Sequence, residues 1–147
     1  MNTKHNHHFK YLYSVLIFLI IPFLAFSQQV DSVILGYGGG FTGQVTLYNI
    51  SKCIIKKGIG LTDVKYLDSA RLKRSTFKKI LTHSKQVRND ISGFYNPYNM
   101  YRFIEIYTDR KLTKYTWGDP NLPPPEKVDS LYNQIITIIS KLKFKHK

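Results

Sequence analysis

The order of the hydrophobic periodicities is the feature that most constrains how this chain can fold. Two blocks of alternating apolar and polar residues, typical of half-buried strands, are each followed by a segment with the period of an amphipathic helix. Short, turn-like connections separate the strands within each block. We therefore predict an α+β domain: one antiparallel, meandering sheet of about four to six strands, with two helices packed on one face. The predicted order is strands, helix, strands, helix.

The turn and cap signals give approximate bounds for these elements. We expect a helix near residues 69–86, because Phe77, Ile80, Leu81 and Ser84 share one helical face. A second helix is expected to begin at Pro125, which suits a first helical turn. Residues Asn89–Met100 read as a loop. The expected strands are Val30–Leu35, Gln44–Ile50, Cys53–Lys57 after a turn at Asn49–Lys52, Leu61–Tyr66, Tyr101–Thr108 and Leu112–Trp117.

Residues 1–27 have the three-part layout of a secretory signal peptide. A positive leader precedes the apolar run Tyr11–Phe26, and Ala25 and Ser27 place small side chains at a cleavage site. Cleavage leaves residues 28–147 as a single domain, exported to the periplasm or secreted. The alternative is an uncleaved anchor in the inner membrane, although the run is shorter than most spanning helices. The one cysteine, Cys53, can form no internal disulfide, and we interpret it as a small buried residue.

The expected mature chain is strongly basic, with 20 Lys and Arg against nine acids and a formal charge of +11. One interpretation is an anionic partner, such as an envelope polymer or lipid. The other is a solvated surface in a chain of lysine-rich composition, and the spread of the cations along the sequence favours it. No nucleic acid is expected as a partner, and membrane contact is expected only if the leader remains uncleaved.

The glycine cluster Gly38–Gly43 is the most specific local motif. It has the G-x-G-x-x-G spacing of a dinucleotide site, but a strand pattern follows it where that site requires a helix. Two interpretations stay open. The glycines either allow positive φ and close backbone approach, or form a loop that meets a partner through free N–H groups and an aromatic ring. The candidate binding residues are Gly38, Gly39, Gly40, Phe41 and Thr42.

Aromatic residues crowd the stretch from residue 94 to residue 117. Tyrosine and tryptophan on loops are favoured binding anchors, because they offer a large area at low entropic cost. On strands, the same residues pair across a sheet face. We take the loop residues as candidates for binding, together with the turn after the last strand: Tyr95, Asn96, Tyr98, Trp117 and Asp119.

Enzymatic chemistry has little support in the sequence. Glu105 is the acid most worth watching, and Cys53 with His83 is the only conceivable nucleophile pair. No catalytic set, metal site or cofactor is expected. The leading hypothesis is an exported, non-enzymatic binding or accessory domain of the bacterial envelope, possibly an inhibitor, with an unknown protein as its partner. A basic module for anionic polymers or lipids and a small hydrolase are the alternatives.

The segments Gly38–Gly43, Asn96–Tyr101 and Thr116–Asp119 carry one resemblance. Their combination resembles small uncharacterised exported proteins of Gram-negative bacteria. Because these proteins have no assigned activity, the resemblance implies no functional residue. It implies only that the three segments meet in space.

Overall fold

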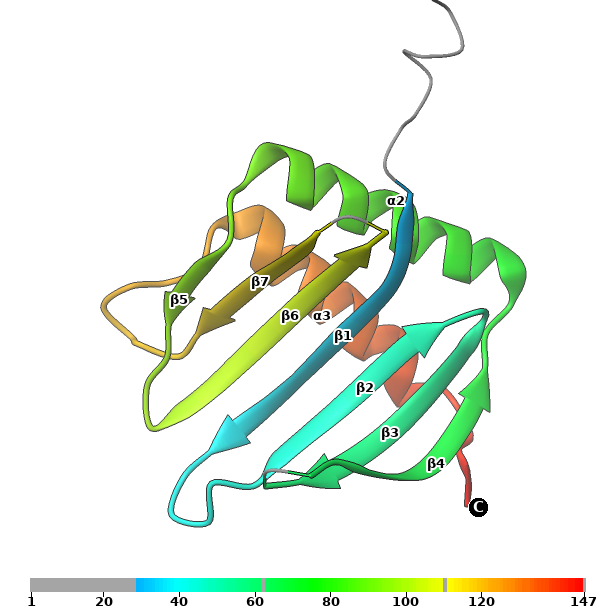
Figure 1. The fold of residues 1–147 in the computed structure, drawn as a ribbon, viewed down its shortest axis with the longest axis horizontal. Coiled ribbons are helices and arrows are strands. Elements are labelled where there is room, and N and C mark those ends of the chain that lie inside the picture. The colour runs from blue at the N-terminus through cyan, green and yellow to red at the C-terminus, as the bar shows by residue number, and fades with distance from the viewer. Residues whose placement is uncertain (1–28, 62, 110, 147) are drawn as a thin grey trace, which may run out of the picture.

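The fold is one open sheet with two helices behind it, as the computed structural model in Figure 1 shows. The structure describes residues 29–61, 63–109 and 111–146. The predicted leader and its cleavage site lie outside these ranges. Within them, neither helix is long and apolar enough to cross a membrane.

The sheet has eight strands in the order β5-β7-β6-β1-β2-β3-β4-β8. All neighbours pair antiparallel except β5 and β7, which pair parallel. The first strand, β1, therefore lies at the centre, and each half of the chain builds outward from it. The bounds are β1 Val30–Gly39, β2 Val45–Ser51, β3 Ile54–Gly60, β4 Lys65–Arg71, β5 Phe94–Asn96, β6 Met100–Thr108, β7 Leu112–Trp117 and β8 Lys145–His146.

Helices α2 (Arg74–Asp90) and α3 (Glu126–Ser140) cover the same face of the sheet. The backbone carbonyl of Pro125 accepts from the N–H groups of Val128 and Asp129 and so begins α3. The predicted apolar stripe of α3 is buried against the sheet. The core combines that stripe with inward-facing strand residues, among them Val33, Leu35, Ile50, Ile55, Ile104, Ile106, Tyr115, Val128, Leu131 and Ile135.

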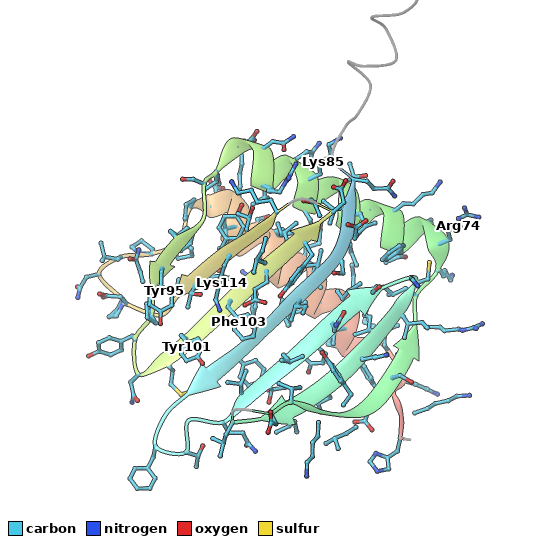
Figure 2. The ribbon with its side chains drawn as sticks, in the orientation of Figure 1. Arg74, Lys85, Tyr95, Tyr101, Phe103 and Lys114 are labelled. Atoms are coloured by element: carbon cyan, nitrogen blue, oxygen red, sulfur yellow. The ribbon has the colours of Figure 1, made fainter. Side chains whose placement is uncertain are left out.

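The opposite face of the sheet carries no helix. Because side chains alternate along a strand, this open face receives the residues between the core positions. Figure 2 shows Tyr95, Tyr101, Phe103 and Lys114 standing on it over β5, β6 and β7. The ring of Phe103 is 7% exposed, because it lies over Gly36 of β1, where a side chain would collide with it.

The prediction of four to six strands is too low, and the sheet is not a simple meander. The predicted loop 89–100 contains β5, and the segment after the second helix contains β8. Both strands are too short to show a period of two. The β5 strand is held by Phe94, whose ring packs edge-on against Tyr115 with centroids 5.7 Å apart. Only a fold that already has β7 and β4 in place provides the partners for these strands.

Three predicted boundaries also move. The strand β1 runs on to Gly39 instead of ending at Leu35. The turn predicted at Asn49–Lys52 lies at Lys52–Cys53, so Cys53 is a half-buried turn residue and not a strand residue. The strand expected at Leu61–Tyr66 is β4, at Lys65–Arg71, and it displaces the start of the first helix from residue 69 to Arg74.

Candidate binding surface at the loop end of the sheet

The three singled-out segments meet at one end of the sheet, which we call the loop end. The N–H of Gly40 donates to the carbonyl oxygen of Asn99 at 2.6 Å, joining the glycine segment to the loop before β6. The N–H of Asp119 donates to the carbonyl oxygen of Asn96 at 3.4 Å, joining the turn after β7 to β5. Residues about 80 positions apart in the chain therefore lie together at this end of the sheet.

The glycines of this edge have a structural reason to be present. Gly39 and Gly40 have φ of +101° and +72°, a region that other residues rarely adopt. A Cβ at Gly39 would also collide with the carbonyl oxygen of Asn99. A Cβ at Gly38, within β1, would lie only 2.8 Å from Cγ2 of Val45. Positive φ therefore accounts for Gly39 and Gly40, and close backbone approach accounts for Gly39, whereas a binding role of the cluster stays a prediction.

Phe41 and Thr42 form the tip of the loop that the glycines create. The Phe41 ring is fully exposed, and the Thr42 hydroxyl accepts from the N–H of Gln44 at 3.4 Å. The tip thus has an anchored backbone and an apolar ring in solvent. An aromatic side chain has only two rotatable χ angles, so fixing it on binding costs little entropy, which favours it as an anchor.

Other large apolar side chains are exposed at the same end. Tyr95 is 70% exposed, Tyr98 is 63% exposed and Met100 is 57% exposed. Leu61, in the loop after β3, is also exposed. Its Cδ2 atom would lie 3.7 Å from a Cβ atom added at Gly43. Large exposed apolar groups gathered at one end of a domain are typical of interaction sites. We call the set of Phe41, Leu61, Tyr95, Tyr98 and Met100 the apolar rim.

A groove of about 720 Å³ lies beside the apolar rim, between the end of the sheet and α3. Arg102 of β6 projects into it, 3.9 Å from a carboxylate oxygen of Asp129 and with its guanidinium 5.6 Å from the centre of the Tyr132 ring. About half of the Arg102 side chain stays exposed. The proline segment Pro120–Pro124 forms part of the opposite wall. The groove thus offers a half-exposed cation among aromatic rings.

Trp117, Asn96 and Asp119 contribute to this end chiefly as support. Trp117 is 5% exposed and packs edge-on against Tyr132, with ring centroids 5.2 Å apart. Asn96 pairs with Trp117 in the sheet. A carboxylate oxygen of Asp119 accepts from the N–H of Asn121 at 2.8 Å and shapes the turn. Trp117 and the half-buried Asp119 also line the groove, and Asp119 is the polar one of the two.

Tyr132 forms the floor of the groove. Burial raises the pKa of its hydroxyl to about 12, although the neighbouring Arg102 acts in the opposite direction. The hydroxyl therefore stays protonated at neutral pH, and it donates to the carbonyl oxygen of Gly36 at 3.3 Å. This bond ties α3 to β1 directly beneath Arg102. The floor is consequently fixed, whereas the rim is exposed.

The residues considered for catalysis lie elsewhere and are already engaged. Glu105, on the open face, accepts from Lys114 Nζ at 2.8 Å and from the Tyr107 hydroxyl at 2.9 Å. Burial and this bond to Glu105 raise the pKa of Tyr107 to about 12. His83 faces α3, with Nδ1 2.7 Å from Gln134 Oε1. Cys53, by contrast, lies in the β2–β3 turn.

Sequence reasoning missed the groove residues Tyr37, Arg102 and Asp129. One signal was present: Arg102 shares the register of Ile104 and Ile106, where an apolar residue belongs. A charge at an inward position of a strand indicates a special environment. Asp129 could be assigned only to the positive end of α3, because its approach to Arg102 depends on the packing of α3 on β6.

The part of the chain that the structure describes holds no cluster of three or more His, Cys, Asp and Glu side chains that could bind a metal ion. No protein-family model, curated protein or solved structure matches this chain.

Proposed function

We propose that this protein is an exported, non-enzymatic domain of the bacterial envelope that binds a partner protein through its loop end. The observation that carries the proposal is the apolar rim. Phe41, Tyr95, Tyr98 and Met100 are more than half exposed, yet the backbones beneath them are joined by hydrogen bonds. Exposed aromatic groups on a fixed backbone are the usual centre of a protein interface.

The groove supports the same proposal and adds an expectation about the partner. Arg102 has a planar guanidinium, which suits a carboxylate better than any other common group on a protein surface. Its present partner, Asp129, is 3.9 Å away and about 40% exposed, so the pair is weak and open to exchange. The partner is expected to present an apolar patch to the rim and an acidic side chain to Arg102.

The experiment compares retention of envelope components by the immobilised mature domain and by two variants, Phe41→Ala and Tyr95→Ala. Each variant should weaken specific retention about tenfold or more, as expected for a side chain central to an interface. Leu112→Ala is the control, because Leu112 is an exposed apolar residue, 47% exposed, at the opposite end of the sheet. Unchanged retention by both rim variants, or equal loss in Leu112→Ala, would contradict the proposal.

A further inference from the structure

The net charge of this domain is confined to two segments. Residues 52–79 and 141–147 hold 13 Lys and Arg against only two acids, Asp63 and Asp68, and so carry +11. The remainder of residues 28–147 holds seven Lys and Arg against seven acids and is neutral. The net positive charge of the expected mature chain therefore comes from the segment between the β2–β3 turn and the start of α2, and from the C-terminal tail.

The fold brings these two segments together. Strand β8 of the tail pairs with β4, with Ser69 opposite Lys145 and Asp68 opposite His146. In Figure 1 the C-terminal end of the chain accordingly lies beside β4. Sequence positions more than 70 residues apart thus contribute to one surface.

Register determines which cations share a face. Lys56 of β3 lies opposite Ser69 of β4, which lies opposite Lys145 of β8. Directly paired residues point to the same side of a sheet. Asn49 of β2, opposite Lys56, alternates with the core residue Ile50, so this row lies on the open face, away from the helices. Arg71, two residues beyond Ser69, lies on the same side.

Two shallow grooves flank Ile54 on this face. One, of about 350 Å³, is lined by Arg71, Lys143 and Lys145 together with Ser69 and Ala70. The other, of about 260 Å³, is lined by Lys52 and Lys56 with Ser32, Asn49 and Ser51. No described residue lining either groove is acidic. Asp68 of β4 pairs with His146 at 2.8 Å, in the next row of the β4–β8 ladder.

We propose that this basic face, defined by Lys52, Lys56, Arg71, Lys143 and Lys145, binds the phosphate groups of an anionic phospholipid surface. All five side chains are exposed. Cations with nearby hydroxyl and amide groups match the charge and the hydrogen-bond acceptors of a phosphate. A flat sheet face with two separate, small grooves suits a layer of individual headgroups, whereas a polymer would require one continuous track. This surface is separate from the apolar rim.

The test measures sedimentation of the mature domain with vesicles of phosphatidylcholine, alone or mixed with phosphatidylglycerol. Binding is expected only to the mixed vesicles and should weaken steeply as salt rises. Each cation removed from the face should weaken binding about fivefold, so Lys56→Gln with Lys145→Gln should weaken it about 25-fold. The matched control, Lys78→Gln with Lys79→Gln, removes the same charge from exposed positions of α2, behind the sheet, and should change binding by less than about fivefold.

Several outcomes would overturn the inference. Equal losses in the two double variants would mean that net charge alone, and not this face, attracts the membrane. Binding to a soluble sulfated polysaccharide without binding to mixed vesicles would assign the face to a polymer. Displacement from the vesicles by millimolar inorganic phosphate at constant ionic strength would assign it to free phosphate. Phe41→Ala should leave vesicle binding intact, so this test is independent of the partner proposed for the loop end.

Discussion

The two central residues of the β2–β3 turn are poorly suited to its backbone geometry, and this mismatch should cost stability. Only Lys52 and Cys53 separate the paired residues Ser51 and Ile54, and both have positive φ, of +48° and +62°. Positive φ at both central positions defines a type I′ turn, for which Asn-Gly is the preferred sequence. Neither lysine nor cysteine favours this region of φ and ψ. Replacing the pair by Asn-Gly should therefore stabilise the domain.

The magnitude follows from two opposing effects at each position. A non-glycine residue in the left-handed region costs about 1–2 kcal/mol, and Cys53→Gly removes that cost. The greater freedom of glycine in the unfolded chain takes back about 0.5–1 kcal/mol. Lys52→Asn adds a smaller gain, because asparagine tolerates positive φ. The double variant should raise the free energy of unfolding by about 1 kcal/mol.

The assay is urea unfolding of the expected mature domain under reducing conditions. The midpoint should rise at an unchanged denaturant slope, which indicates a change in stability and not in unfolded-state compactness. Ser51→Gly is the control, since Ser51 is a neighbouring residue in extended strand backbone and its replacement should lose about 0.5–1 kcal/mol. A midpoint that stays constant or falls in the double variant would refute the assignment of strain to this turn.

Two further predictions concern the core and its tyrosines. Burial raises the pKa of Tyr115 and of Tyr132 to about 12, so these two tyrosines ionise near pH 10 only in the unfolded chain. Stability should be retained below pH 10 and fall between about pH 10 and 12, by up to about 1.4 kcal/mol per pH unit for each tyrosine, in urea midpoints measured across that range. Ile135→Ala, at a fully buried position of α3, should cost about 2–5 kcal/mol in the same assay, whereas Thr137→Ala, at an exposed position, should change stability by less than about 0.5 kcal/mol. A flat alkaline profile, or equal effects of the two α3 variants, would contradict these assignments.

The elements that sequence reasoning places well are those whose signal is local. Strands β6 and β7 and their hairpin follow from strict alternation on both sides of a short turn, and Thr108 and Lys111 close that turn as expected. Helix α3 follows from its apolar stripe and from Pro125 at its start. In each case the period along the chain and the burial in the fold agree, so no distant partner is needed to define the element.

The features that sequence reasoning misses depend on partners far along the chain. The β5 strand forms only by pairing with β7, and β8 forms only by pairing with β4. The groove forms where Arg102 of β6 and Asp129 of α3 approach each other. The turn at Lys52–Cys53 was misplaced because its residues are not turn formers. Sheet register overrode local preference there, as tertiary context often does for short segments.

The same limit applies to the charge of this chain and changes how it should be interpreted. Along the sequence the excess of cations is divided between two segments more than 60 residues apart, 52–79 and 141–147, and this separation favours a solvated surface. That inference assumes that segments far apart in the chain are also far apart in space. The pairing of β4 with β8 contradicts this assumption, because it brings the two basic segments together. Lys52 lies in the strained β2–β3 turn and also lines a groove of the basic face. A lysine kept where asparagine would be more stable is expected to serve binding, so the stabilised Asn-Gly variant should bind anionic vesicles about fivefold more weakly. A variant that gains stability and keeps full vesicle binding would separate the strain of the turn from any role in binding.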